Sequence, residues 1–394
     1  MQLLAEEFQV VDTDTHIIEP YDLWTARMSV GKWGDKVPHV KWDERAQEDA
    51  WYFGEERVFS AGFSAHAGWN EYFPDTPKRL SDVSPALWRA EDRLQLMDAY
   101  GIHSQILFPN VAGFGAGRYL ALTDPVLMLE CLQAYNDWLS DWSSAAPTRL
   151  IPQMAMPLWD VAACVKEMER CTRKGHKGVV MSADPAAFGL PKLSDPHWDT
   201  VWAAAQEMGL PVNFHVASGD PGAMDIVTMM DKSAGRRAAS AAMNALAALD
   251  NSKAIAQLIC GGICHRFPRL NFVSVESGVG WLPFVLAGLD YQWKNCAVTH
   301  EHPEYDLLPS EYFRRQIYGC FWFEEETLRS TIAQLGADNI LYETDFPHPT
   351  SMSPGPASIA IRPADYIERA FEGVSREDAG KILHGNAARI YHLN

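Results

Sequence analysis

The sequence predicts an α/β fold, a closed (β/α)8 or TIM barrel. Eight short apolar runs rich in β-branched residues alternate with amphipathic helical stretches, a pattern typical of parallel strands covered by helices. Eight strand and helix pairs are the number that closes such a barrel. An open doubly wound sheet is the alternative, but no G-x-G-x-x-G phosphate loop follows a strand. We therefore expect a single barrel domain over residues 1–394.

The expected elements follow one another in regular order along the chain. The expected strands occupy residues 10–18, 104–110, 150–157, 178–182, 211–216, 271–278, 316–322 and 339–347. Helical periodicity predicts intervening helices over residues 89–100, 124–142, 160–174 and 197–208. Gly101 and Gly209 are expected to end two of these helices. A long connection follows the fifth strand and leads into an Ala-rich and Leu-rich helix.

Residues 21–90 interrupt this alternation directly after the first strand. The segment contains six tryptophans, many turn-forming residues and a predicted hairpin from His39 to Phe59. We expect an insertion that caps the mouth of the barrel, where it shields a pocket or forms a subunit contact. A plain insertion stabilised by its own aromatic cluster is the alternative.

Composition and net charge indicate which kinds of molecule this protein is able to bind. A chain of 394 residues, 47% of them hydrophobic, can bury a large core. The formal net charge of -18 disfavours nucleic acids and anionic membranes, which bind basic surfaces. No apolar run reaches the roughly 20 residues that a membrane helix needs, and no signal-like segment opens the chain. We expect a cytoplasmic protein that acts on a small molecule and binds neither nucleic acid nor membrane.

The seven cysteines contain no C-x-x-C pair, so reduced thiols are expected rather than a disulfide framework. Cys260, Cys264 and His265 are close enough in sequence to suggest a metal cluster. Cysteines four residues apart on a helix are, however, more typical of packing.

Polar residues at the carboxyl ends of four expected strands form the candidate site. Asp14 and His16 lie on one face of the first strand, because side chains two residues apart point the same way. His215 closes the fifth strand, Glu276 the sixth and Asp345 the eighth. All five side chains are expected at one mouth, because the carboxyl ends of barrel strands meet there. Two carboxylates and two imidazoles suit zinc, iron or manganese and leave positions for water and substrate.

These motifs resemble the amidohydrolase superfamily. The D-x-H pair, the fifth-strand histidine and T-D-F-P-H at 344–348 are similar to its amidohydrolase-related branch, which contains aminocarboxymuconate-semialdehyde, resorcylate and carboxyvanillate decarboxylases. The similarity also covers residues 158–160, 265–268, 276–278 and 384–389. The resemblance implies one divalent metal ion bound by Asp14, His16, His215 and Asp345.

Two positions depart from that branch. Asp14 stands where relatives carry His or Glu, which leaves the metal open among Zn, Mn and Fe. Glu276 stands where the decarboxylases place a histidine that handles a proton. Glu276 is therefore expected to be a general acid or base, a ligand of a second metal ion, or an anchor for His215.

Further residues are expected around this centre. His348, on the loop after the eighth strand, is expected to transfer a proton or hold the substrate. Glu19 and Asn110 are expected to contact the substrate at the rim. Aromatic residues near the expected mouth indicate an apolar or aromatic substrate that bears a polar group. These aromatic residues are Phe108, Phe114 and Trp322.

Such a site is compatible with several functions. We rank hydrolysis of an amide, ester or lactone first, with Asp345 taking the proton of a metal-bound water as the resemblance implies. The alternative is nonoxidative decarboxylation of an aromatic or unsaturated acid. A third function is oxygen activation by two irons, with Glu276 and His348 as added ligands. A barrel that serves only as a non-catalytic partner subunit is the fourth.

Barrels of this family commonly pair, so a homodimer is expected. The helix predicted over residues 283–294, with Phe284, Leu289 and Trp293, is a candidate for its interface.

Overall fold

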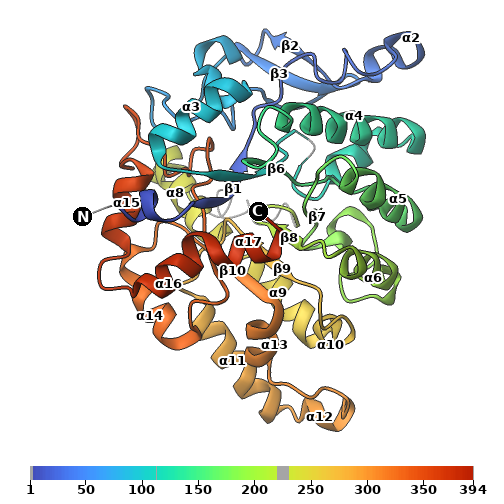
Figure 1. Cartoon of the computed structure of the whole chain (residues 1–394). Coiled ribbons are helices and arrows are strands. Elements are labelled where there is room, and N and C mark those ends of the chain that lie inside the picture. The colour runs from blue at the N-terminus through green and yellow to red at the C-terminus, as the bar shows by residue number, and fades with distance from the viewer. Residues whose placement is uncertain (1–2, 112, 220–229, 394) are drawn as a thin grey trace.

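Eight parallel strands form a closed barrel surrounded by helices in the computed structural model, which describes residues 3–111, 113–219 and 230–393 (Figure 1). Hydrogen bonds order the barrel strands as β1-β5-β6 and as β11-β10-β9-β8-β7. Two parallel bridges, Thr15 with Phe346 and Met154 with Val179, join these sheets into a ring. The predicted (β/α)8 fold is confirmed.

Every barrel strand begins inside a run that the sequence marks as a strand, but all eight end earlier than predicted. The barrel strands are β1 (Val11–His16), β5 (Ser104–Phe108), β6 (Leu150–Pro152), β7 (Val179–Met181), β8 (Val212–His215), β9 (Phe272–Val275), β10 (Ile317–Phe321) and β11 (Ile340–Tyr342). Glu276 and Asp345 therefore follow their strands instead of closing them. Both residues have left-handed backbones, with φ of 52° and 56°, which is incompatible with an extended strand.

The four predicted helices are confirmed as α3, α4, α5 and α6. Asp124 caps α4 by accepting the N–H groups of Val126 and Leu127, while Gly101 and Gly209 end α3 and α6 with left-handed backbones. The α-helices of the described residues are α1 (Leu4–Glu7), α2 (Val30–Trp33), α3 (Ala90–Tyr100), α4 (Pro125–Ser143), α5 (Val161–Thr172), α6 (Asp199–Met208), α8 (Arg236–Ala247), α9 (Asn251–Cys260), α10 (Ile263–Arg266), α11 (Leu282–Asn295), α12 (Val298–Glu301), α13 (Pro309–Gln316), α14 (Glu325–Leu335), α15 (Pro363–Ala370), α16 (Arg376–Gly380) and α17 (Asn386–Ile390).

Between β1 and α3 the chain builds a separate antiparallel sheet from β2 (His39–Asp43), β3 (Glu48–Phe53) and β4 (Glu56–Ser60). β2 and β3 form the predicted hairpin, to which β4 adds a third strand. This sheet lies beside α4 at the top of Figure 1. Buried Trp24 joins the two, because its ring meets Trp51 of β3 edge-on at 5.2 Å and its indole N–H donates to the Cys131 carbonyl of α4.

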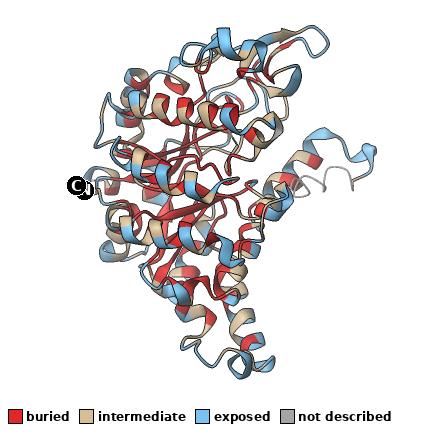
Figure 2. Cartoon of the chain, turned by 90° about the vertical axis from the view of Figure 1, so that its right-hand side faces the viewer, coloured by how far each residue is buried: buried red, intermediate tan, exposed pale blue. Residues whose placement is uncertain are grey.

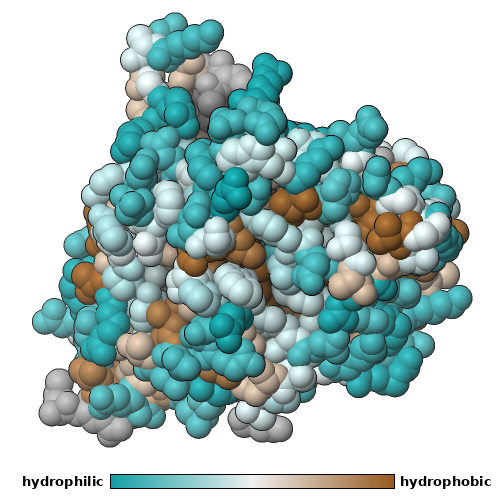
Figure 3. Space-filling view, turned by 90° about the horizontal axis from the view of Figure 1, so that it is seen from above, coloured by the Kyte–Doolittle hydropathy of each residue, from teal (hydrophilic) through white to brown (hydrophobic). Residues whose placement is uncertain are grey.

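The core lies in and around the barrel strands, whereas the helices expose their outer faces (Figure 2). α8 projects from the barrel at the end opposite the termini (Figure 2). The face seen in Figure 3 is mostly hydrophilic, with hydrophobic residues in scattered groups. Among the described residues, no helix is both long and apolar enough to cross a bilayer.

The remaining sequence expectations have mixed outcomes. All seven cysteines are free thiols, as expected. On α11, Phe284 is 83% exposed and remains a candidate interface residue. Trp293 is not available for an interface, because it is buried and stacks on Tyr305 with ring centroids 5.8 Å apart.

Candidate metal centre

The segment after β11, the last barrel strand, lies next to the end of β1, the first one. Residues far apart in sequence therefore come side by side. The Asp345 N–H donates to the Asp14 carbonyl at 3.0 Å, and the His16 N–H donates to the Phe346 carbonyl at 2.6 Å. These two hydrogen bonds hold the segment that follows β11 beside the carboxyl end of β1. Asp345 therefore reaches Asp14 and His16 even though it lies outside the strand.

All four predicted metal ligands are fully buried, and their ligand atoms meet in overlapping groups. Asp14, His16 and His215 form one group, while Asp345 joins His16 in a second group and Asp14 in a third. The His16 Nε2 atom lies 3.3 Å from Asp14 Oδ1 and 3.6 Å from Asp345 Oδ1. The His215 Nε2 atom lies 3.4 Å from the same Asp14 oxygen and 3.1 Å from His16 Nε2.

The donor atoms of this cluster fit a divalent cation. His215 Nδ1 donates to the Val216 carbonyl at 2.9 Å, so its Nε2 presents a lone pair to the cluster. Both carboxylate oxygens of Asp14 are buried and accept no hydrogen bond from the described residues. Ligands about 2.1 Å from one ion lie about 3.0 to 3.4 Å apart. A divalent ion at this position would therefore be bound by the Asp14 carboxylate and by the histidine Nε2 atoms, which lie this close together in the fold.

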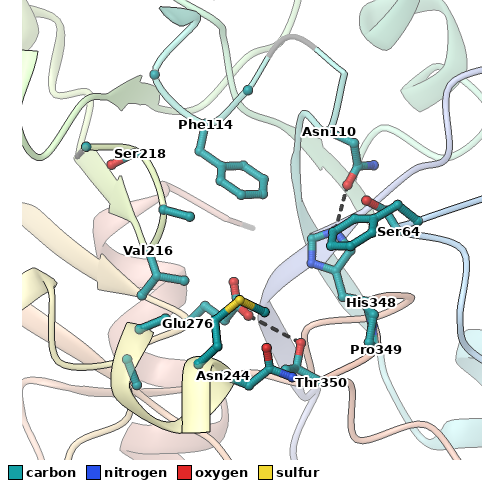
Figure 4. Close-up of a pocket in the computed structure, with 18 of the residues that line it drawn as sticks. Ser64, Asn110, Phe114, Val216, Ser218, Asn244, Glu276, His348, Pro349 and Thr350 are labelled. Carbon is teal, nitrogen blue, oxygen red and sulfur yellow. Dashed lines mark hydrogen bonds between the residues drawn. The ribbon is translucent and has the colours of Figure 1, made fainter. Parts of the chain in front are cut away.

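Glu276 lies beside this cluster and faces the adjoining cavity. Its backbone N–H donates to Glu343 Oε2 at 3.0 Å, which supports its left-handed backbone. Its Oε2 atom lies 3.6 Å from His215 Nε2. The Thr350 hydroxyl lies between the acids: it donates to Asp345 Oδ2 and is 3.3 Å from Glu276 Oε1 (Figure 4).

His348 lies next to His16 and Asp345 of the candidate metal centre. Its Nε2–H donates to Asn110 Oδ1 at 2.6 Å (Figure 4), and its Nδ1 lies 2.8 Å from Asp345 Oδ1. Its ring stacks on His16 with centroids 3.8 Å apart. The Asn110 amide is itself oriented, because its Nδ2 donates to the Ile17 carbonyl at 2.8 Å.

The structure revises the expected role of Glu19. The side chain is buried and does not line the cavity. Its Oε1 accepts the N–H groups of Asn110 and Val111 at 2.9 and 3.0 Å. Glu19 thus positions Asn110, which does line the cavity, and is not a substrate contact.

The electrostatics of the cluster follow from burial and crowding. Burial, reinforced by neighbouring carboxylates, raises the pKa of Glu276 and of Asp345 well above the ordinary range. Burial also raises the pKa of Asp14, but His215 and His16 outweigh it and hold that pKa below its usual value. Burial lowers the pKa of His348 to about 3. The metal-free cluster thus disfavours the ionised forms of Glu276 and Asp345, and a divalent cation would reverse this preference.

A cavity of about 430 Å³ adjoins the cluster through Glu276, His348 and Phe114. The Phe114 ring stacks on His215 with centroids 3.7 Å apart. Trp322 lines the cavity as expected, whereas Phe108 is buried in the core and does not. Other aromatic walls come from the segment after β1 and from the loop after β7. These walls are Phe59, Phe63, Phe73 and Phe188.

Five polar residues of the cavity were missed by the sequence reasoning, namely Ser64, Arg118, Ser218, Asn244 and Thr350. Thr350 follows T-D-F-P-H by two residues, which was the only available signal. The grouping of Cys260, Cys264 and His265 does not recur among the described residues whose ligand atoms converge.

The family model for amidohydrolases matches residues 11–393. The chain belongs to the amidohydrolase family. Among curated members, it is 26% identical over 360 residues to gamma-resorcylate decarboxylase of Polaromonas sp., covering 89% of this chain and 98% of that protein. It is 23% identical over 329 residues to 2-amino-3-carboxymuconate-6-semialdehyde decarboxylase of Dictyostelium discoideum, covering 80% of each.

Solved structures of other amidohydrolases share the fold. An amidohydrolase from Mycobacterium avium subsp. paratuberculosis superimposes with a TM-score of 0.75 at 22% identity, covering 98% of this chain and 99% of that one. A dihydroxybenzoic acid decarboxylase from Polaromonas sp. superimposes with a TM-score of 0.63 at 19% identity, covering 98% of both chains. That decarboxylase contains manganese and the inhibitor 2-nitroresorcinol.

Proposed function

We propose that this amidohydrolase is a metal-dependent, nonoxidative decarboxylase of a small aromatic acid. The observation that carries the proposal is the convergence of two carboxylates and two imidazoles beside an aromatic-walled cavity. The curated relatives, which are decarboxylases over nearly the full length of this chain, support the reaction. Decarboxylation therefore ranks above the hydrolysis that we put first from the sequence.

Asp14, His16, His215 and Asp345 are the proposed metal ligands. A divalent ion at this site would hold the substrate carboxylate and its neighbouring oxygen and offset the charge that develops as the C–C bond breaks. We favour manganese, because a structural relative contains it and because oxygen and nitrogen ligands suit it. Glu276, Asp14 and Asp345 also converge, so a second ion bound through Glu276 is an outcome that the tests below distinguish.

Glu276 is the proposed proton donor. Its carboxyl group lines the cavity, and burial with the neighbouring Asp345 keeps its pKa high, which favours the protonated form. When carbon dioxide leaves, the electron pair stays on the ring carbon, which takes the Glu276 proton. Solvent then reprotonates the carboxylate. Glu276 thus takes the role of general acid, one of the three roles expected for it from the sequence, at the position where the decarboxylases of the resembling branch carry a histidine.

His348, Asn110 and Thr350 orient the reacting groups in this proposal. Asn110 fixes the His348 ring through the 2.6 Å bond to Nε2. The Nδ1 atom of His348 then faces Asp345 Oδ1 at 2.8 Å and orients that carboxyl group towards the metal site. Phe114, stacked on His215, supplies an apolar wall for an aromatic ring.

The function is tested by measuring carbon dioxide release from 2,6-dihydroxybenzoate and 2-hydroxybenzoate, without oxygen, by protein loaded with Mn²⁺. We expect release from at least one of these acids and its loss after chelation. Glu276→Gln should lower kcat by about 100-fold or more, since positioned acids contribute that much. Its Mn²⁺ affinity should stay within about threefold of the parent.

The exposed substitution Glu301→Gln on α12 is the matched control and should leave kcat unchanged. Cleavage of phenyl esters or lactones without any carbon dioxide release would restore hydrolysis to first place. A strict requirement for oxygen would instead indicate the two-iron reaction.

A further inference from the structure

Arg118 brings a permanent positive charge to the cavity. It lies on the 3-10 helix η4 (Gly117–Leu122), which follows the loop after β5, and its side chain is partly buried. Among the described residues that line the cavity, it is the only lysine or arginine. The guanidinium lies over the Phe59 ring at 4.3 Å from the ring centroid.

Within the described part of the chain, Arg118 forms no hydrogen bond and no ion pair. The nearest influence is Glu19, whose charge favours the guanidinium, although burial lowers the pKa of Arg118. No hydrogen bond or ion pair joins Glu19 to Arg118 in the described structure, and the Glu19 Oε1 atom accepts two backbone N–H groups instead. Arginine nevertheless stays charged in proteins, and a partly buried charge without a partner is costly. The five N–H donors of this guanidinium are therefore available to a ligand.

Packing contacts hold the Arg118 side chain in place, and none of them neutralises its positive charge. Gly113 has φ of 73°, and a Cβ there would contact the Arg118 stem at 3.4 Å, so the stem packs closely against the loop backbone. Phe59 covers one face of the guanidinium plane. Arg118 makes no ion pair with Glu276 or Asp345, so its charge is separate from the metal centre. The cavity thus has two sites for negative charge, one at the metal ligands and one at Arg118.

We propose that Arg118 binds a second anionic group on the substrate ring, so that the preferred substrate is an aromatic dicarboxylate. This inference rests on the proposed decarboxylase function, in which the metal centre holds the carboxylate that leaves. A planar guanidinium matches a carboxylate through two parallel hydrogen bonds. A cavity of about 430 Å³ has room for a single substituted ring.

The test compares three probes by calorimetric titration of the Mn²⁺-loaded protein: 2-hydroxybenzoate and its derivatives with a second carboxylate at ring position 4 or 5. At least one dicarboxylate should bind the parent protein about 10- to 100-fold more tightly than 2-hydroxybenzoate, as expected for a charge-assisted pair. Arg118→Met keeps a stem over Phe59 but lacks the charge, and should remove this preference. Arg118→Lys should restore part of it.

Arg79→Met is the matched control, because Arg79 lies over Trp42 at the same 4.3 Å but does not line the cavity. It should retain the full preference for the dicarboxylate. Carbon dioxide release from 2-hydroxybenzoate with no dicarboxylate preference in the parent protein would overturn the inference and leave the proposed function intact. A preference that survives in Arg118→Met would also overturn it, and failure of all three probes to bind would overturn both.

Discussion

Asp14 shows most directly why the site requires a cation. Its carboxylate is fully buried, lacks hydrogen-bond donors among the described residues and faces the Nε2 atoms of His16 and His215. A buried polar group that accepts no hydrogen bond costs about 1 to 3 kcal/mol. The left-handed backbones of Glu276 and Asp345 add strain of about 1 to 3 kcal/mol each. These unfavourable free energies all fall on residues of one site, which indicates that the site is kept for its function and not for the stability of the fold.

Glu19 gives a pH prediction at the scale of one residue. Burial raises its pKa from 4.5 to about 7. Between these values the folded protein keeps the proton that the unfolded chain loses, so stability is highest below pH 4.5 and falls as pH rises towards 7. Two to three pKa units correspond to about 3 kcal/mol. Glu19→Gln, which retains the acceptor for Asn110 and Val111, should remove this component of the loss.

The measurement is urea unfolding of parent and variant at pH 5 and pH 7.5. The free energy of unfolding of Glu19→Gln relative to the parent should increase between these pH values. The exposed Glu55→Gln, in the turn between β3 and β4, should show no such change. An equal pH dependence in parent and Glu19→Gln would refute the prediction.

At the scale of elements, the sequence was sufficient to predict those strands and helices whose hydrophobic pattern follows from burial. The barrel strands form apolar runs because both faces are covered, and Asp14, His16 and His215 could be placed at strand ends for that reason. Arg118 and Thr350 could not be placed, because their positions depend on loops. Such loops follow local hydrogen bonds and left-handed backbones, which leave no periodicity in the sequence.

The helix α3 fixes the position of β1 through one side chain. Arg93 is fully buried and donates to the carbonyls of His16 and Ala86 at 2.8 and 2.7 Å and to Gln105 Oε1 at 3.1 Å. Arg93→Met would leave these acceptors unsatisfied, so we expect a loss of about 3 kcal/mol in the free energy of unfolding. Displacement of His16 should also weaken Mn²⁺ binding by about 10-fold.

Chemical unfolding and Mn²⁺ titration of the same samples check both effects. Arg89→Met is the control, because this exposed arginine at the start of α3 forms its one ion pair within the described part of the chain with its neighbour Asp92, at 3.0 Å. We expect it to cost less than about 1 kcal/mol. Equal stability of Arg93→Met and Arg89→Met would contradict the positioning role.

The whole molecule is arranged so that distant segments meet at one end of the barrel. The bridge between Thr15 and Phe346 closes the ring and brings Asp345 to Asp14. The segment 21–90 contributes Phe59, Phe63 and Phe73 to the cavity, which supports our proposal that it caps the mouth. That role was open from the sequence, because its aromatic residues serve equally well in an independent cluster.

The most direct test of the metal centre is a titration of metal-free protein with Mn²⁺, counting the ions bound per chain. We predict one ion per chain, with affinity at least 100-fold weaker in Asp345→Asn and unchanged in the surface control Cys260→Ser. Two ions would assign Glu276 to a second site. If no ion binds, or if Asp345→Asn binds Mn²⁺ as tightly as the parent, the proposed metal centre and the decarboxylation that depends on it are wrong.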